Sequence, residues 1–409
     1  MTSNNAVEKP IRGFLFACTD KTEKEIFDRM LVGTNKVYAP IAIRIREGDL
    51  IFVHNIDSDA LYGVYEASSN FGMDIVPEAW GGKYPYQLKV GVLGGVVKIE
   101  KGRKILKKMG IKRNTPLHGR RLITFLDIFK SELNEIISSR KGSEEITSEL
   151  NGKITEIKET PNQTDIEDEI PIVEATTLWD FPKQSYGPTP KGDNKYPGVT
   201  PAQLIWNMVW RYTEPGDLVV DPMCGSGTTI DVCRTEGRRA IGYDISPARP
   251  DIIQNDARSI PLEDNSVDLV FIDSPYGDNV RYNDNSDNIG NISSEGEEFY
   301  DELEKVMRES HRILKEGRVL GWLIGDQWVQ KRFTPVGFKI YDRLNRYFET
   351  VDVVCVARRG QVSHTSSWYN RARRNNFYLR GFKYLFIVRK TSRETETKPR
   401  KIRWARYKK

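Results

Sequence analysis

The sequence has little cysteine and little histidine, and it has no long apolar run. Its 409 residues include four cysteines, none in a CxxC pair, and four histidines. Disulfide frameworks and zinc sites both need several such side chains at short spacing, so neither is expected. No run approaches the roughly 18 apolar residues that span a bilayer, and residues 1–12 lack the apolar core of a signal peptide. We therefore expect a cytoplasmic protein that binds no metal.

Acidic residues are missing from one long stretch, residues 353–390. Within it, residues 358–380 combine arginines with aromatic side chains. Arginines bond phosphates and aromatic rings stack on unpaired bases, so the mixture predicts a nucleic-acid surface, although an ordinary basic loop has the same composition. The candidate contact residues are Arg358, Arg359, Trp368, Tyr369, Arg371, Arg373, Arg374 and Arg380.

Acidic charge is concentrated instead near the middle of the chain. Residues 144–169 carry nine acidic and two basic side chains, a net charge of −7 in a chain whose total is +5. Residues 138–170 have no usable apolar period and predict a flexible linker. This linker would separate an N-terminal domain, residues 10–135, from a C-terminal domain, residues 172–390. A basic tail, residues 391–409, follows and suits a sequence-independent contact with phosphates.

The C-terminal domain alternates apolar runs with helical patterns. Seven strand-like runs lie between residues 217 and 389, which predicts an α/β fold with a largely parallel sheet and helices on both faces. The last two runs, 350–357 and 382–389, follow each other without a helical pattern between them. They predict an antiparallel pair at the sheet edge.

The N-terminal domain is richer in β-type runs. A helix is expected over residues 23–31, with Asp20 or Thr22 as its cap. The pattern predicts a small α+β barrel-like module. The four clearest strand-like runs are residues 13–17, 50–54, 61–67 and 87–92.

A glycine turn, residues 221–229 (DPMCGSGTT), follows one of the predicted strands. Glycines let backbone N–H groups approach a ligand closely. No lysine completes a P-loop here, and Ile230 stands where a dinucleotide site has its third glycine. Asp244 and Asp256 end the next two strands, where carboxylates suit ribose hydroxyls and an adenine amine, unless they are surface turn residues. The candidate cofactor residues of these strand ends are Asp221, Pro222, Cys224, Gly225, Gly227, Thr228, Asp244 and Asp256.

A second short motif, residues 273–276 (DSPY), follows the apolar run 267–272. The amine of a nucleobase is a poor nucleophile because its lone pair is delocalised into the ring. The Asp273 side chain and the Ser274 or Pro275 carbonyl can accept its two N–H bonds and turn the lone pair toward a methyl donor. Tyr276 offers a ring for a base swung out of its stack. The alternative is a strand that ends in a simple proline turn.

Covalent attack on a base is disfavoured. Methylation of a cytosine ring carbon needs a thiolate, usually from a Pro-Cys pair, and the sequence has no Pro-Cys dipeptide. Cys224 lies inside the glycine turn and Cys355 inside an apolar strand, so both are expected to be packing residues.

Together these motifs resemble the HPTQKP…GD…LDPFxGSGTT and (D/N/S)PP(Y/F) elements of the amino-methylating DNA methyltransferases. Tyr196 and Thr200 stand where those elements have His and Lys, and Ser274 replaces the first proline of the second element. The first element closes over the cofactor in that family, so the resemblance adds Pro201 to the candidate cofactor residues. The resemblance implies a seven-stranded, Rossmann-like methyltransferase domain with S-adenosylmethionine as donor. It implies methylation of adenine N6 or cytosine N4 in DNA. Two alternatives remain: the protein methylates an amine in RNA, or it is catalytically silent and binds modified bases.

The N-terminal domain has a resemblance of its own. Residues 13–18 (GFLFAC), 61–68 and 78–85 resemble the development and cell death domain. That resemblance implies a compact β-rich fold related to the PUA, EVE and YTH modules, several of which hold nucleic acids or modified bases. Its aromatic side chains either line a base pocket or pack in the core. The three aromatic candidates are Tyr62, Tyr65 and Trp80.

Overall fold

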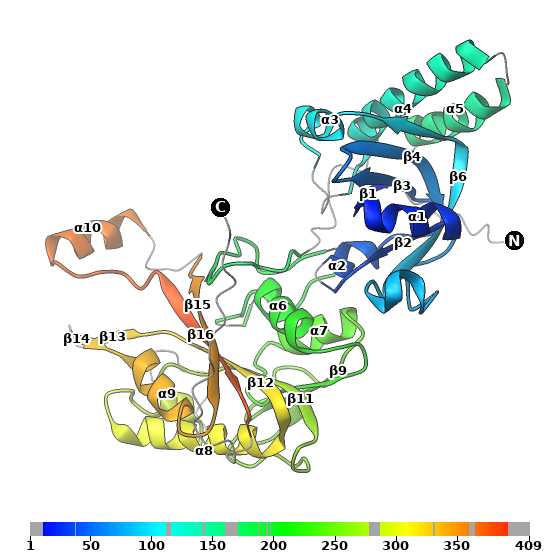
Figure 1. Cartoon of the computed structure of the whole chain (residues 1–409). Helices are drawn as coiled ribbons and strands as arrows, with labels where there is room; N and C mark the ends of the chain where they lie inside the picture. The colour runs from blue at the N-terminus through cyan, green and yellow to red at the C-terminus, as the bar shows by residue number, and fades with distance from the viewer. Residues whose placement is uncertain are drawn as a thin grey trace, which may run out of the picture. The chain divides into compact units, whose positions relative to one another are not determined.

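The computed structural model divides the chain into two compact units, Met1–Ile172 and Val173–Lys409 (Figure 1). No helix among the described residues is long and apolar enough to cross a membrane. Most of the predicted basic tail, residues 392–409, lies outside the residues that the structure describes. The structure describes residues 11–36, 38–111, 116–140, 144–159, 171–187, 189–193, 195–196, 198–277, 287–329, 332–359 and 365–391.

The second unit is built on a mixed sheet with the strand order β10-β9-β8-β11-β12-β16-β15-β7. Strands β10 to β12 pair in parallel, and β16 runs antiparallel to both β12 and β15. The α/β fold predicted from the alternating pattern is confirmed. The strands are β7 (Leu178–Trp179), β8 (Leu218–Asp221), β9 (Arg239–Asp244), β10 (Ile253–Gln254), β11 (Val267–Asp273), β12 (Leu314–Ile324), β15 (Glu349–Ala357) and β16 (Phe382–Arg389).

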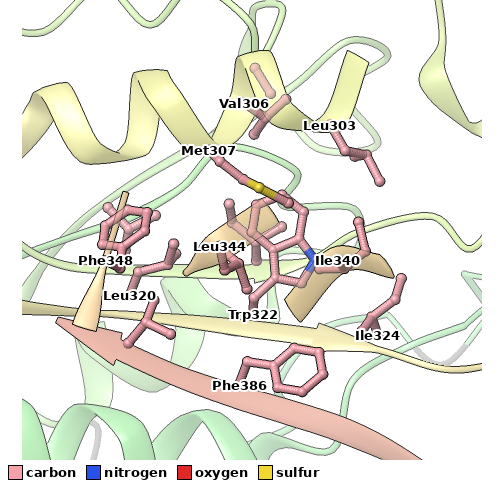
Figure 2. Packing of buried hydrophobic residues seen from close by; sticks show 14 of the residues in the cluster. Leu303, Val306, Met307, Leu320, Trp322, Ile324, Ile340, Leu344, Phe348 and Phe386 are labelled. Carbon is pink, nitrogen blue, oxygen red and sulfur yellow. The ribbon is translucent and has the colours of Figure 1, made fainter. Parts of the chain in front are cut away.

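Helices cover both faces of this sheet. Trp322 of β12 is fully buried beneath α8 (Glu297–Ile313) and α9 (Val336–Leu344). Figure 2 shows Leu303, Val306 and Met307 of α8 above this indole, at the spacing that places side chains on one helix face. A side chain at the preceding position, Gly321, would lie on the opposite face of the sheet.

A side chain at Gly321 would meet Met208 of α6 (Ala202–Tyr212), so α6 lies on that opposite face. The helix α7 (Thr228–Thr235) packs against α6 and β9. Glycine at position 321 therefore lets α6 approach the sheet closely.

The edge of the sheet differs from the prediction in two ways. A short strand, β7, pairs with β15, so the described sheet has eight strands and β15 is not at its edge. A helix, α10 (Ser366–Arg374), lies between β15 and β16 where a loop was expected. Both elements are short, and α10 buries only Ala372, so neither produces a readable apolar period. A small hairpin of β13 (Gln327–Val329) and β14 (Arg332–Thr334) was also missed.

The first unit contains a strongly curved sheet with the order β1-β3-β4-β6-β2, and β5 pairs with β6. The long strand β6 pairs with both β4 and β2, which gives the predicted barrel-like form. The strands are β1 (Gly13–Cys18), β2 (Leu31–Thr34), β3 (Leu50–Asn55), β4 (Ala60–Ala67), β5 (Gly72–Met73) and β6 (Tyr86–Ile99). The other elements are α1 (Asp20–Arg29), α2 (Ala39–Ala42), η1 (Ala79–Gly82), α3 (Gly102–Met109) and α4 (Gly119–Arg140).

Two local predictions in this unit need correction or completion. The helix α1 begins at Asp20, so Thr19 is its cap instead of Asp20 or Thr22. The Thr19 backbone N–H donates to the Thr22 hydroxyl oxygen at 2.9 Å. Tyr62 and Tyr65 are buried in the core, as the packing alternative predicted.

The prediction of a flexible linker over residues 138–170 is wrong for residues 138–140, which end α4, and for residues 144–159. Residues 144–159 form the helix α5 (Glu144–Glu159), which packs against α4 and β6. Leu150, Ile154 and Ile157 are buried in the core of the first unit. Their spacing of four and three residues is helical, but the surrounding acidic side chains conceal it. Residues 160–170 lie outside the described residues.

Candidate functional site

The carboxyl ends of β8, β9 and β11 open on a cavity of about 860 Å³ in the second unit. This cavity brings together most of the residues singled out in the sequence. The predicted residues that line it are Pro201, Asp221, Pro222, Cys224, Gly225, Thr228, Asp244, Asp256, Asp273, Ser274, Pro275, Tyr276, Arg358, Arg359, Trp368 and Arg380. Those that do not line it are Gly227, Tyr369, Arg371, Arg373 and Arg374.

The glycine turn between β8 and α7 needs both of its glycines. Gly225 and Gly227 have φ angles of +49° and +82°, a region that side chains disfavour. A Cβ atom at Gly225 would lie 3.0 Å from the Tyr196 ring, and one at Gly227 would lie 2.6 Å from the Arg249 guanidinium. Gly227 thus makes room for Arg249 and does not face the ligand space.

Asp221, at the end of β8, holds the turn in shape from inside. Its buried carboxylate accepts hydrogen bonds from the Met223 backbone N–H at 3.1 Å and from the Thr229 hydroxyl at 2.5 Å. Burial raises the pKa of Asp221 to about 7, and the nearby carboxylates of Asp244 and Asp273 act in the same direction. This side chain can therefore carry a proton near neutral pH.

Asp244 and Asp256 both border the cavity, and each is already hydrogen-bonded. The Asp244 carboxylate accepts from the Gly225 N–H and from the Ser246 N–H, both at 2.9 Å, and burial raises its pKa. Asp256 is ion-paired with Arg258 at 2.6 Å. Their contacts with ribose and adenine stay predictions.

Cys224 is a packing residue, as expected. It is buried in a small apolar cluster with Ile230 and Ile252, and burial raises the pKa of its thiol well above the usual value. Cys355 is half-buried in β15, paired in register with Tyr384 of β16. All four cysteines are free.

Asp273 ends β11 and is the centre of a polar cluster that the sequence did not reveal. The Thr200 hydroxyl donates to its Oδ2 at 2.6 Å, and the Lys383 ammonium lies 3.1 Å from the same oxygen. The Tyr276 hydroxyl donates to Oδ1 at 3.2 Å. The sequence marks Thr200 only as the residue that replaces the lysine of the related motif, and it does not predict the contact with Asp273. Lys383 lies 110 residues further along the chain, and no local pattern marks it.

The serine that replaces the first proline of the related motif has a structural partner. Ser274 is buried, and its hydroxyl oxygen accepts a hydrogen bond from the Trp322 indole N–H at 3.0 Å. A proline has no side-chain acceptor, so it would leave this buried N–H without that bond. The pairing of Ser274 with Trp322 explains the departure.

Tyr276 places its ring along the cavity and is held at both ends. Burial raises the pKa of its phenol well above the usual value, so the hydroxyl stays neutral and can donate to Asp273. Its backbone carbonyl accepts a hydrogen bond from the Gln327 side-chain amide. This carbonyl is therefore engaged, whereas Ser274 and Pro275 remain the predicted backbone acceptors for a base amine.

The rim of the cavity carries aromatic rings and arginines from elements that are distant in sequence. Trp328 of β13 is 39% exposed and stacks on Phe377, with ring centroids 5.7 Å apart. The Arg380 guanidinium lies 5.3 Å from the Phe333 ring centroid and 6.0 Å from that of Trp328. Trp328 and Phe377 line the cavity as well. Phe377 is one of the aromatic residues of the predicted surface 358–380, whereas Trp328 lies outside that stretch and was not predicted.

The predicted nucleic-acid residues divide into two groups. Arg358, Arg359, Trp368 and Arg380 line the cavity, and Arg359 also forms an ion pair with Asp180. The other group lies on α10, outside the cavity lining and exposed to solvent. It comprises Tyr369, Arg371, Arg373 and Arg374.

The first unit holds a separate, smaller cavity of about 210 Å³. Its walls are mostly apolar side chains of β1, α1 and α2, and they include the rings of Trp80 and Tyr84. The Trp80 indole N–H donates to the Thr22 carbonyl at 3.1 Å, and its ring meets that of Tyr84 edge to face at 5.7 Å. Of the three predicted aromatic residues, Trp80 alone lines this cavity.

Two family models match the sequence. The model described as DNA methylase matches residues 101–255, and the model of the development and cell death domain matches residues 12–105. Both resemblances inferred from the motifs are therefore confirmed. The DNA methylase match includes the glycine turn and ends before Asp273.

Curated relatives divide in the same way. Residues of this chain are 42% identical over 55 residues to the type II methyltransferase M.Cfr9I of Citrobacter freundii, covering 13% of this chain and 18% of that protein. They are 35% identical over 69 residues to the DNA adenine methyltransferase YhdJ of Escherichia coli K12, covering 17% and 23%. They are 32% identical over 87 residues to the B2 protein of Daucus carota, covering 20% and 42%. The chain thus spans less than half the length of these relatives.

Solved structures resemble parts of the chain at low identity. One is a geranyl diphosphate methyltransferase in complex with S-adenosylmethionine, at 16% identity and a TM-score of 0.32, covering 46% of this chain and 84% of that one. Another is TrmN from Thermus thermophilus, at 16% identity and a TM-score of 0.33, covering 47% and 50%.

Proposed function

We propose that the second unit transfers the methyl group of S-adenosylmethionine to the exocyclic amine of a base in DNA. The observation that carries this proposal is the shared cavity: the glycine turn and the Asp273–Tyr276 motif face the same space. The match to the DNA methylase model and the type II methyltransferase relatives support the same reaction. This reaction requires a cavity whose size and polar groups fit both S-adenosylmethionine and the base.

The residues present fit this donor. The cavity volume lies within the roughly 300–1,000 Å³ typical of small-molecule sites. Asp244 and Asp256 place carboxylates on its wall, as acceptors for ribose hydroxyls and an adenine amine. Asp244 also braces Gly225, so the turn and its carboxylate are fixed together before any ligand binds. When bound, the donor supplies a methyl group on a positively charged sulfur.

Asp273 and Tyr276 prepare the base amine. The Asp273 carboxylate accepts one N–H of the amine and a backbone carbonyl of Ser274 or Pro275 accepts the other, which turns the nitrogen lone pair toward the methyl carbon. As the new carbon–nitrogen bond forms, the carbon–sulfur bond breaks and its electron pair stays on sulfur. The nitrogen then loses one proton to solvent. The Tyr276 ring supports the base from one side.

Adenine N6 is the preferred target within this proposal, because the motif begins with Asp at position 273. Cytosine N4 offers the same geometry of an amine beside a ring nitrogen. The base is read outside the duplex, since its amine is not accessible to this site within a stack. The aromatic and arginine side chains of the rim, including Trp328 and Arg380, suit unpaired bases and phosphates. An RNA amine is the alternative target.

The role of Asp273 can be tested with the full chain, labelled donor and genomic DNA. Asp273→Ala is expected to abolish methyl transfer while the dissociation constant for the donor stays within about twofold of wild type. Glu263→Ala, which removes an exposed carboxylate, is the control and should transfer methyl groups normally. Retained turnover in Asp273→Ala would remove this residue from its assigned role. If the wild-type chain labelled neither DNA nor transfer RNA, the proposed methyltransferase activity would be wrong.

The smaller cavity supports a second proposal, that the first unit binds a single base. Its apolar walls and aromatic rings suit a flat ring with an apolar substituent, as in a methylated base. N6-methyladenosine should therefore bind the full chain more tightly than adenosine in calorimetric titrations. Trp80→Ala should remove this difference and leave methyl transfer to short DNA unchanged. Equal binding of both nucleosides by wild type would refute the proposal.

A further inference from the structure

We propose that Lys383 is a positioning residue for the methyl transfer. Its ammonium holds the Asp273 carboxylate aimed at the base amine, and so supplies from β16 a cation where the related motif carries one at the position of Thr200. This inference rests on the proposed function of the second unit.

The contacts around Asp273 show where the ammonium acts. Lys383 Nζ lies 3.1 Å from Oδ2 and 3.5 Å from Oδ1 of Asp273, and each side chain is 14% exposed. An ion pair this enclosed is screened much less by salt than a surface pair. The Thr200 hydroxyl donates to the same Oδ2 at 2.6 Å. One carboxylate oxygen thus receives both a hydroxyl and an ammonium.

The sheet register explains how a residue from so far along the chain reaches the site. Asp273 of β11 pairs with Leu323 of β12, and Leu323 pairs with Leu385 of β16. Lys383 is two residues from Leu385 on the same strand, so its side chain lies on the same face as that of Leu385. The ammonium is therefore carried by a paired strand of the sheet. A strand fixes such a group more firmly than a loop does.

The ammonium of Lys383 restricts the direction in which the Asp273 carboxylate points. Both oxygens of Asp273 lie within 3.5 Å of Lys383 Nζ, and Asp273 and Lys383 both line the cavity. Charge-assisted contacts of this kind are stronger than neutral hydrogen bonds. Lys383 therefore holds the acceptor in place where the reaction needs it.

The departure at Thr200 fits the same account. The related HPTQKP element has lysine where this chain has Thr200, and Thr200 touches the very oxygen that Lys383 contacts. A threonine hydroxyl can align a carboxylate, but it brings no charge. Lys383 brings the charge from β16. Its Nζ also lies 5.1 Å from the Tyr276 ring centroid, so one ammonium steadies both the acid and the ring beside the base.

The experiment compares full-length variants in methyl transfer to DNA at saturating donor. Lys383→Met keeps the apolar length of the side chain and removes the charge, so turnover is expected to fall by about 10- to 100-fold. Lys383→Arg should retain most of the turnover. The double variant Lys383→Met, Thr200→Lys should turn over at least about fivefold faster than Lys383→Met alone, because the new lysine returns a cation to the same carboxylate. Melting temperature is measured for each variant so that turnover is compared only where the protein is folded, and donor affinity should change little.

A double-mutant cycle separates positioning from a merely structural role. In an Asp273→Asn background there is no carboxylate to hold, so Lys383→Met should change the residual turnover by less than about twofold. Equal losses in both backgrounds, or no loss in Lys383→Met alone, would overturn the role of Lys383 while the proposed function stands. A wild-type chain that transfers no methyl group would instead overturn the proposed function, and the role of Lys383 with it.

Discussion

At the scale of single residues, burial controls the chemistry of the glycine turn. Asp221 is enclosed among backbone and hydroxyl donors, and its burial raises its pKa to about 7. An isolated Asp side chain titrates near 3.9. The folded protein therefore binds a proton at Asp221 more tightly than the unfolded chain does over the interval between these values.

This difference predicts a pH-dependent stability. The contribution of protonated Asp221 is fully present below about pH 4 and is lost as the pH rises through about 7. Asp221→Asn cannot titrate, so its melting temperature should fall less than that of wild type between about pH 5 and about pH 8. Calorimetry of the unliganded proteins measures both curves, with the exposed Asp264→Asn as control. Parallel curves for wild type and Asp221→Asn would contradict the assignment.

The buried bond between Ser274 and Trp322 gives a second prediction at this scale. Ser274→Pro restores the proline of the related motif but leaves the Trp322 N–H unsatisfied, which should lower the free energy of unfolding by about 1–3 kcal/mol. The same change in a Trp322→Phe background should cost clearly less, because the orphaned donor is gone. Denaturant unfolding of the four proteins measures the coupling. Equal costs in both backgrounds would show that the bond does not explain the serine.

At the scale of elements, the strong periods of the sequence predicted most of the second unit. The runs that became β9, β11 and β16 are apolar and bounded by polar turns, and α8 shows a wide apolar stripe. The elements that were missed are short or masked by charge. The strand β7 has two residues, and α10 buries a single one.

The helix α5 is the clearest case of a masked element, and it supports a stability prediction. Leu150 is buried in the core of the first unit, whereas Ser148 on the same helix is exposed. Leu150→Ala should lower the free energy of unfolding of that unit by about 2–5 kcal/mol. Ser148→Ala should have almost no effect. If Leu150→Ala were as harmless as the control, α5 would be no part of the folded core.

At the scale of the whole molecule, each unit has its own apolar core and its own cavity. The motif residues of the larger cavity were predictable because each motif is continuous in sequence and follows a strand. Thr200, Gln327 and Lys383 were not, because no local pattern marks them as partners of Asp273 and Tyr276. Thr200 precedes α6, Gln327 lies in the β13–β14 hairpin, and the register of β16 beside β12 brings Lys383 to the site. Local patterns therefore predict the reacting groups, and the fold adds the groups that hold them.

Methylation of a base amine in DNA can be tested by identifying the nucleoside that receives the labelled methyl group. The full chain is incubated with methyl-labelled S-adenosylmethionine and either genomic DNA or transfer RNA, and the products are digested to nucleosides and separated. We expect label in N6-methyldeoxyadenosine, or in N4-methyldeoxycytidine if cytosine is the target. Label in 5-methyldeoxycytidine, in ribonucleosides alone, or in no nucleoside would rule out methylation of a base amine in DNA.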